Sequence, residues 1–346
     1  NYYKKILVFE KEKHKINTNI GVAYFKLGKI NKSINAFKDS IENDPNFRLA
    51  HINLGISYLE LSMLEKAIKH FVIALKLNEN DHQTQNYLIN SLNLSKPKIN
   101  QQHPLLEINS KIIKLSEEKK VNDQYETKYI KKLIKESNYI IKSYKNVLFL
   151  NETQIFRKNS ENLNCNRHFK VFNEFNVIPK YCFGCYKIQI NLKTVIDLIK
   201  LFLIFDKIKL EKNNTRKCII EMRKKIKGNY KGYVYCEGLP EAEKIKTILS
   251  KVLFKKNINI DKINIKHGCS EFYETYPKFE EISLNKNENM KYNNKWKSFE
   301  DIIDSREPKR IEADKKIWSK SIQGINLSDI LIINNWISYA QITGDE

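Results

Sequence analysis

The chain has few of the residues that mark the common catalytic and membrane-spanning motifs. Its 346 residues include only 10 glycines, which never gather into a phosphate-binding loop. Neither a G-x-S-x-G elbow nor an H-E-x-x-H motif occurs. The best apolar stretch, Val195–Phe205, contains two charged residues and is shorter than the roughly 18–20 residues of a membrane span. We therefore assign no catalytic residue, leave enzyme activity open and expect no membrane partner.

Arginine is scarce in a chain that is otherwise strongly basic. The formal charge is 61 − 40 = +21, yet only seven of the 61 basic residues are arginine. Arginine is the side chain best shaped for bidentate contact with phosphate or guanine. The lysines are spread along the chain, and a stripe of them fits the wet side of an amphipathic helix, at Lys128, Lys131, Lys132, Lys135 and Lys142. Charge alone therefore gives only weak support for a nucleic-acid partner.

The sequence starts at Asn1, and no basic-then-apolar leader follows. We therefore expect no secretion signal, a cytoplasmic location, and a chain that is an excerpt of a longer protein. All six cysteines lie at or after Cys165, and without a secretion signal a disulfide framework is not expected.

The first hundred residues repeat with a period of 34. Glycine recurs at 21 and 55, where we expect two helices to cross too closely for a Cβ atom. Aromatic residues that fill the space between paired helices, and small residues at further crossings, recur at the same offset: Tyr24 and Tyr58, Phe37 and Phe71, Ser33 and Ala67, Ser40 and Ala74. Pro45 is placed to end the second helix of the first repeat.

These spaced positions resemble the tetratricopeptide repeat family over residues 14–80, with a degenerate third repeat from about Asp81. The pattern departs from the family at Asn17, His51 and Glu79. The resemblance implies an α-solenoid whose first helices line a groove for a protein or peptide partner. The groove positions it implies are Thr18, Val22, Phe25, Ile52, Ile56 and Leu59. They are mostly apolar, which favours an apolar helix or extended segment over an acidic terminus; alternatively, they contact the next repeat or the C-terminal half.

Cysteine and histidine pairs follow in the second half of the chain. Cys165 and His168 form a C-x2-H pair, and Cys182 and Cys185 form a C-x2-C pair. Two chelating pairs separated by a span that can fold back suit tetrahedral zinc, so we expect a zinc site here. Cys269 or His267 is a substitute ligand if one of the first pair is absent from the site. Reduced packing cysteines or a redox pair are the alternatives.

Between the cysteine pairs and Cys269, the pattern predicts strands and helices in the order β-α-β-β-α-β. We expect strands at 186–190, 216–222, 230–236 and 260–266, and helices at 194–208 and 240–254. This order predicts a ferredoxin-like α+β domain. A hairpin centred near Lys227 would pair Cys218 with Cys236 as core thiols. The end of the last strand would lie beside the start of the first, which brings Cys269 toward Cys182 and Cys185.

Lys231-Gly-Tyr233-Val-Tyr235 resembles the third-strand signature of the RNA-recognition motif. The resemblance implies that Tyr233 and Tyr235 stack bases on an exposed sheet face, with Lys231 and Arg223 beside them. The first strand carries Lys187 and Gln189 where that family has a second stacking aromatic.

The sequence thus predicts four regions: tetratricopeptide repeats over 1–97, a helical spacer over 98–160, a cysteine-rich α+β domain over 161–275 and a helical tail over 276–346. We expect a protein-interaction scaffold whose α+β domain is stabilised by zinc. An RNA-binding protein and an enzyme with its site in the C-terminal half are the alternatives.

Overall fold

The structure is a computed structural model that describes residues 12–94, 102–117, 125–146, 148–157, 163–222, 228–279, 289–306 and 324–345. The sequence-based expectations for Arg223 and for the hairpin centre near Lys227 lie outside these residues. The chain divides into two compact units. The first unit comprises residues 1–123, 128–151 and 308–332, and the second comprises 124–127, 152–307 and 333–346.

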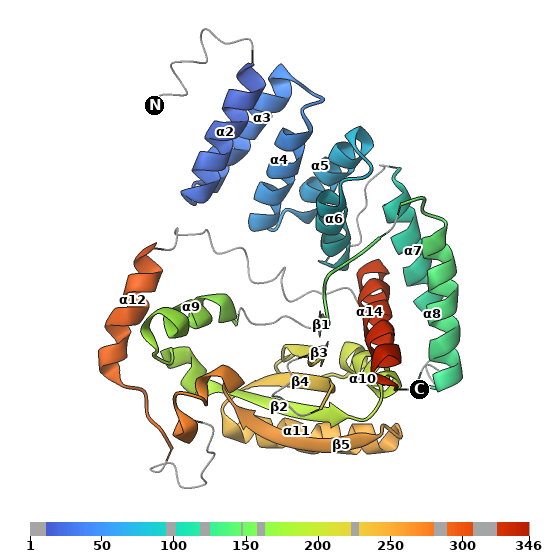
Figure 1. Cartoon of the computed structure of the whole chain (residues 1–346), viewed down its shortest axis with the longest axis vertical. Helices are drawn as coiled ribbons and strands as arrows, with labels where there is room; N and C mark the ends of the chain where they lie inside the picture. The colour runs from blue at the N-terminus through green and yellow to red at the C-terminus, as the bar shows by residue number, and fades with distance from the viewer. Residues whose placement is uncertain are drawn as a thin grey trace. The chain divides into compact units, whose positions relative to one another are not determined.

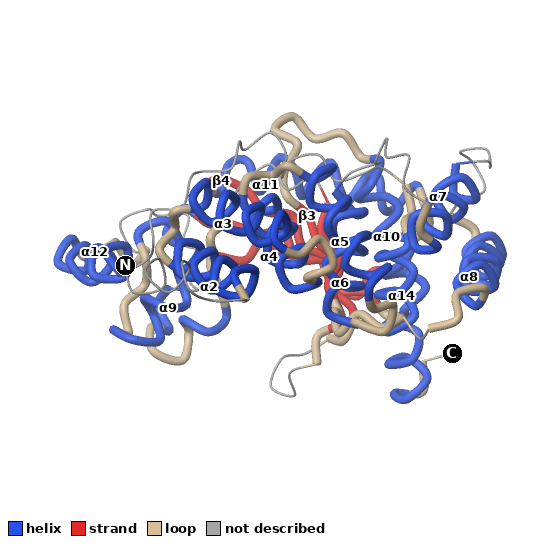
Figure 2. Tube along the Cα trace, turned by 90° about the horizontal axis from the view of Figure 1, so that it is seen from above, coloured by secondary structure: helices blue, strands red, loops and turns tan. Residues whose placement is uncertain are grey.

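The first unit begins with antiparallel helix pairs, as the 34-residue period predicts. The helices are α2 (Lys13–Lys26), α3 (Ile30–Asn43), α4 (Arg48–Glu60), α5 (Leu64–Leu77) and α6 (His82–Leu94). Figures 1 and 2 show these helices side by side, each packed on the next along the chain. The N-terminal region is therefore a stack of helical repeats, which confirms the predicted solenoid.

The glycines at the repeat positions lie where the helices of a pair approach most closely. A Cβ built on Gly21 would lie 2.4 Å from the ring of Phe37, and one on Gly55 would lie 2.5 Å from the ring of Phe71. Both rings are fully buried. The small residues Ser33, Ser40, Ala67 and Ala74 are fully buried as well. The close approach of helices predicted at the two glycines, and the burial predicted at Phe37 and Phe71, are confirmed.

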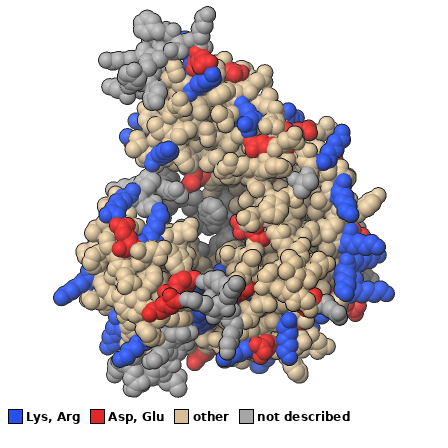
Figure 3. Space-filling view, viewed as in Figure 1, with Lys and Arg blue, Asp and Glu red and all other residues tan. Residues whose placement is uncertain are grey.

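Two further helices, α7 (Pro104–Glu117) and α8 (Thr127–Lys142), follow the repeats and confirm the helical spacing predicted for this segment. The lysine stripe of α8 is exposed at Lys128, Lys131, Lys132, Lys135 and Lys142. Figure 3 shows basic side chains gathered along the edge where α8 lies. The stripe is the solvated side of an amphipathic helix, since α8 buries Ile130, Leu133 and Ile134 on its other side.

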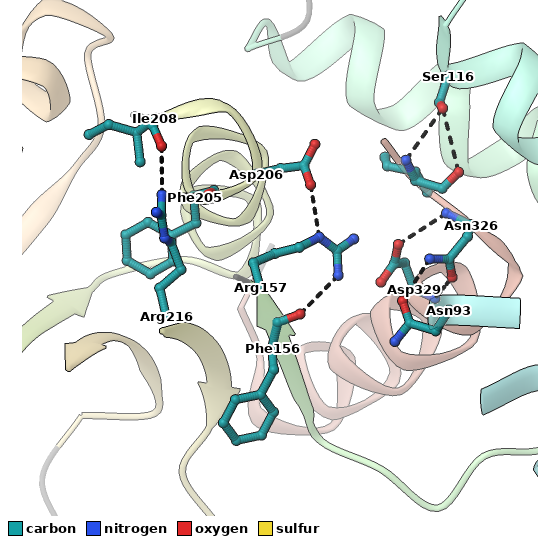
Figure 4. A network of polar contacts seen from close by, with 11 residues as sticks. Asn93, Ser116, Phe156, Arg157, Phe205, Asp206, Ile208, Arg216, Asn326 and Asp329 are labelled. Atoms are coloured by element: carbon teal, nitrogen blue, oxygen red, sulfur yellow. Dashed lines mark hydrogen bonds and ion pairs between the residues drawn. The ribbon is translucent and has the colours of Figure 1, made fainter. Parts of the chain in front are cut away.

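A long C-terminal helix, α14 (Leu327–Thr343), begins in the first unit with a reciprocal cap. The backbone N–H of Asn326 donates to the Asp329 carboxylate at 3.0 Å, and the backbone N–H of Asp329 donates to the Asn326 side chain at 3.1 Å. The Asn326 amide also donates to Asn93 at 2.8 Å, and Ser116 accepts from the backbone N–H of Ile325 (Figure 4). Most of α14 is buried, which fits its apolar composition.

The second unit is built on an antiparallel sheet of five strands. The strands are β1 (Gln154–Arg157), β2 (Cys185–Leu192), β3 (Arg216–Ile220), β4 (Tyr230–Glu237) and β5 (Ile260–His267), in the spatial order β1-β3-β4-β2-β5. Helix α10 (Val195–Lys207) packs on one face: a Cβ on Gly232 would lie 2.2 Å from Leu201. Helix α11 (Leu239–Lys255) lies along β2, β4 and β5 (Figure 1).

The structure corrects two details of the predicted sheet. Cys218 lies opposite Gly232 instead of Cys236, and Ile220 lies opposite Tyr230, so the partner of each β3 residue is shifted by four residues along β4 from the prediction. A shift by an even number keeps every side chain on its face, and Cys218 and Cys236 are both core thiols as predicted. The strand β1, in the segment predicted to be a helical spacer, adds an edge next to β3.

Two buried arginines tie this edge of the sheet to the C-terminal end of α10. Arg157 donates to the Asp206 carboxylate at 2.8 Å and lies 4.5 Å from the centre of the Phe202 ring. Arg216 donates to the carbonyl oxygens of Phe205 and Ile208 at 3.0 and 2.7 Å (Figure 4). A cation is favourable there because the last carbonyl groups of a helix carry its negative partial charge.

An aromatic layer completes the second unit beyond the sheet. It involves α9 (Cys165–Phe175), the short 3-10 helices η1 (Lys180–Gly184), η2 (Ser270–Phe272) and η3 (Pro277–Phe279), and α12 (Lys297–Arg306). Ile178, Cys182, Phe272 and Phe279 form its buried centre. The indole of Trp336 is fully buried and donates to the Thr153 carbonyl at 2.8 Å. No helix among the described residues has both the length and the apolar content to cross a membrane.

Candidate functional site: a thiol pocket

Four cysteines from three separate stretches of the second unit line one pocket. Cys165 is the first residue of α9, Cys182 lies in η1, Cys185 opens β2 and Cys269 directly precedes η2. The cavity has a volume of about 10 Å³, which is about the minimum space that admits a single water. Its wall is completed by Leu163, His168, Phe169, Tyr181, Lys187 and Phe272. The two remaining cysteines belong to the sheet core and do not line the pocket.

The pairing of β2 with β5 places Cys269 at the pocket. Tyr186 lies opposite His267, and the backbone N–H of Gly268 donates to the Cys185 carbonyl at 2.8 Å. Gly268 has φ +56°, and a Cβ there would lie 2.3 Å from the Phe279 ring, so only glycine fits the turn that leads into Cys269. The prediction that the end of this strand approaches Cys182 and Cys185 is confirmed.

Lys187 carries a charge into the pocket wall. Its side chain is 8% exposed, and its ammonium donates to the Sγ of Cys269 at 3.0 Å and lies 5.3 Å from the centre of the Tyr235 ring. Burial lowers the pKa of Lys187, but Cys269, Tyr235 and Cys185 together raise it well above its usual value. Lys187 is therefore a buried ammonium held by sulfur and an aromatic ring.

The two histidines considered as metal ligands differ in position. His168 lines the pocket, is buried and stacks on Tyr181 with ring centres 5.1 Å apart. Burial, followed by the charge of Arg167, lowers the pKa of His168 to about 4, so its imidazole is neutral. His267 is not part of the pocket wall. Its ring nitrogens lie 2.7 and 3.1 Å from the carbonyl oxygens of Phe279 and Phe183, so both face backbone oxygens in this structure.

Two of the pocket thiols have raised pKa values. Burial among aromatic rings raises the pKa of Cys182, with smaller contributions from the neighbouring thiols. Burial and then Cys269 raise the pKa of Cys165. Within the described residues, no three His, Cys, Asp or Glu side chains are arranged so that they hold a metal ion as they stand.

A charged network fixes α9, and with it Cys165, against α12. Arg167 donates to both carboxylate oxygens of Asp304 at 2.8 Å and to Glu300 at 2.6 Å. Glu300 also accepts from the Lys180 backbone N–H at 2.9 Å and from the Tyr292 hydroxyl at 2.9 Å. One carboxylate therefore connects α9, η1 and the segment before α12, so it positions two of the elements that carry pocket cysteines.

The residues considered for RNA stacking do not form an open platform. Lys231 and Tyr235 are buried, so the prediction of an exposed basic and aromatic face is wrong at both positions. Lys231 lies 3.7 Å from the buried Glu221 carboxylate. The ring of Tyr233 is half-buried and has the Lys217 ammonium 5.4 Å from its centre. Lys217 and Lys187 therefore lie over the rings of Tyr233 and Tyr235, on which bases would stack.

The predicted groove residues lie on α2 and α4, the first helices of the two repeats. Val22, Phe25, Ile52, Ile56 and Leu59 are half-buried, so each keeps part of its apolar surface exposed. Thr18 is different: it is buried, and its hydroxyl lies 2.9 Å from that of Ser40 on α3. Thr18 therefore contributes to the packing within the first helix pair.

Sequence reasoning missed Lys187 as a pocket residue. The alternation of β2 placed it on the face away from α10, where a lysine is normally solvated, and no local signal reveals that the aromatic layer covers it. The one available signal was its distance of two residues from Cys185, which puts both side chains on the same face of the strand.

Comparison with known proteins supports the prediction that the first helix pair is a tetratricopeptide repeat. Residues 14–47, which span α2 and α3, match the family model described as Tetratricopeptide repeat. No curated protein matches the chain. Tetratricopeptide repeats generally bind protein partners, which places the N-terminal unit among protein-interaction modules at this general level.

Proposed function

We propose that the chain is an adaptor that binds an apolar helix or extended segment of a partner protein on the α2 and α4 surface. The observation that carries the proposal is the set of half-exposed apolar side chains on these two helices. Ile52, Ile56 and Leu59 follow one another at spacings of four and three residues, so they share one side of α4. Val22 and Phe25 supply the equivalent surface of α2.

The chemistry of this surface favours an apolar ligand over a charged one. Within each repeat, the second helix presents its charged residues outward: on α5, Glu65, Lys66 and Lys69 are exposed. The first helices carry their charged residues only near their ends: Arg48 and Glu60 on α4, and Lys13, Lys15 and Lys26 on α2. An apolar segment loses water-exposed surface when it binds there, whereas an acidic terminus would find no lysine to pair with on α4.

A peptide selection tests the proposal. A library of random 15-residue peptides is selected on the full chain, and binding of the enriched peptides is measured by fluorescence anisotropy. We expect enriched peptides with apolar residues at helical or alternating spacing. Replacing Ile56→Lys together with Leu59→Lys should weaken their binding at least tenfold, because each change places a charge against apolar peptide surface.

The matched control reverses charge on the outer side of the same repeat, with Lys66→Glu and Lys69→Glu on α5. This variant should bind the peptides as the unaltered chain does, and circular dichroism should show equal helix content in all variants. Enrichment of acidic peptides, or equal binding by the Ile56/Leu59 variant, contradicts the proposal.

We further propose that the sheet and helices of the second unit form a ferredoxin-like domain with one added strand. The order β2-α10-β3-β4-α11-β5 along the chain and β3-β4-β2-β5 across the sheet supports this assignment. The strand β1 then extends the sheet beyond β3. In this arrangement the thiol pocket lies at the end of the sheet where β2 starts and β5 finishes.

A further inference from the structure

We infer that the thiol pocket is a zinc site whose ligands are Cys165, Cys182, Cys185 and Cys269, with Lys187 as a buried cation that offsets part of their charge. The inference is independent of the proposed adaptor function, because all five residues belong to the second unit.

The convergence of the thiols is the first argument. Four of the six cysteines, contributed by α9, η1, the start of β2 and the turn between β5 and η2, line one cavity of about 10 Å³. Cys182 and Cys185 provide the two-residue spacing from which one loop supplies two ligands. The sulfurs do not surround a common point as they stand. Each sulfur is placed by a single side-chain torsion with three wells, so its position can change by rotation about that bond.

The buried lysine is the second argument. Four thiolates on a zinc ion carry a net charge of −2, which is costly to bury without compensation. Lys187 supplies a positive charge inside the pocket wall, and its ammonium already donates to Cys269 at 3.0 Å. Hydrogen bonds from outer groups to metal-bound sulfur are a general means of orienting such ligands. Among the described residues, no carboxylate forms an ion pair with Lys187, so thiolates are the available counter-charge.

The contact of Lys187 with Cys269 favours Cys269 over His168 as the fourth ligand. A set of three thiolates and a neutral imidazole would leave Cys269, which already accepts from Lys187, as an unligated thiol in the pocket wall. His168 instead packs its ring against Tyr181 and forms part of the wall. All-sulfur ligation with tetrahedral geometry favours zinc among the common divalent ions.

Metal analysis of the full chain tests the inference. The chain is purified under reducing conditions, passed over a desalting column with a weak chelator, and analysed by mass spectrometry of the elements. We expect one zinc per chain. Cys269→Ala should reduce the zinc content at least tenfold, whereas His168→Gln and the two core variants Cys218→Ala and Cys236→Ala should retain it.

Because a cysteine variant can fail to fold, a spectroscopic measurement uses the unaltered chain. Zinc is exchanged for cobalt, whose visible bands report tetrahedral geometry and whose ultraviolet charge-transfer bands scale with the number of thiolates. We expect the intensity of four thiolates, unchanged by His168→Gln. Lys187→Met should keep the cobalt spectrum but weaken zinc in a chelator competition about 10- to 100-fold, and Lys187→Arg should restore part of that loss.

Several results overturn the inference. These are an unaltered chain without zinc whose pocket thiols all react with a thiol reagent, a disulfide among the four cysteines, or iron in place of zinc. Zinc content that is retained by Cys269→Ala but lost with His168→Gln would make His168 the fourth ligand. That result equally contradicts the assignment of Cys269.

Discussion

At the scale of single residues, His51 shows how the first unit compensates for a departure from its repeat pattern. Its Nε2 lies 3.0 Å from the Pro45 carbonyl oxygen, and its Nδ1 lies 3.0 Å from the Nδ1 of His70. If Nε2–H donates to Pro45, Nδ1 of His51 accepts from His70, and both rings are neutral. Burial, and then the proximity of His51, lower the pKa of His70 to about 4. A hydrogen-bonded pair therefore fills the position at which the sequence departs from the repeat pattern.

This pair predicts a loss of stability in mild acid. An unfolded histidine has a pKa near 6.5. Between about pH 6.5 and 4, His70 therefore binds a proton in the unfolded chain and stays neutral in the folded chain. The stabilisation is complete above pH 6.5 and is lost as the pH falls toward 4, by at most about 3 kcal/mol. Urea unfolding followed by circular dichroism at pH 7, 5.5 and 4.5 measures it. His70→Asn, which keeps a donor but does not titrate, should flatten the dependence; an unchanged slope contradicts the assignment.

Gly55 provides a second prediction at this scale. Adding a methyl group in Gly55→Ala puts it 2.5 Å from the buried Phe71 ring, which cannot move away without disturbing the helix pair. Overpacking costs about 1–3 kcal/mol and outweighs the gain of roughly 1 kcal/mol in helix propensity. Urea unfolding should show the net loss, and Phe71→Leu in the same chain should recover part of it. Gly184→Ala, where no atom lies within 4 Å of the new Cβ, is the matched control and should be neutral.

At the scale of elements, the contact of α9 with α12 depends on charge. Arg167 lowers the pKa of Asp304, chiefly through their hydrogen bonds. Burial tends to raise the pKa of Glu300, but the Lys180 backbone N–H and Arg167 bring it below its usual value. Both carboxylates therefore stabilise the folded state above their unfolded pKa values of 3.8 and 4.5, and that stabilisation is lost as the pH falls below this range.

Substitutions distinguish the contributions of Glu300 and Asp304 to the free energy of unfolding. Glu300→Gln should cost about 2–3 kcal/mol at pH 7, because it weakens a buried group with three partners. Asp304→Asn should cost no more than about 1 kcal/mol, because half of that side chain is exposed to solvent. Asp301→Asn, on the same helix with only an exposed lysine partner, should stay within about 0.5 kcal/mol. Guanidinium unfolding followed by the fluorescence of the tryptophans measures all three, and equal losses for Glu300 and Asp301 contradict the network.

The sequence predicted most elements of both units, and the misses have physical causes. The 34-residue period and the alternation in β2, β4 and β5 are set by local side-chain patterns, so the helix pairs and strands were found within a few residues of their bounds. The register of β3 with β4 depends on the connection between them, which the pattern does not constrain. The four-residue strand β1 contains Gln154 and Arg157 and has no apolar alternation of its own. The burial of Lys187 and Tyr235 comes from packing in three dimensions, which a strand pattern does not encode.

At the scale of the whole molecule, the formal net charge of +21 predicts weak attraction to any polyanion. We expect single-stranded RNA to bind weakly at 50 mM salt and to be released by 200 mM salt, without sequence preference, since phosphate contacts alone would carry the affinity. Fluorescence anisotropy with two RNA probes of different sequence measures this. Lys131→Glu with Lys135→Glu on the exposed stripe of α8 should weaken the residual binding several-fold. Tyr233→Ala should leave it unchanged, because Lys217 already covers that ring. A salt-resistant, sequence-selective complex that Tyr233→Ala abolishes would instead establish the sheet face as an RNA-binding surface.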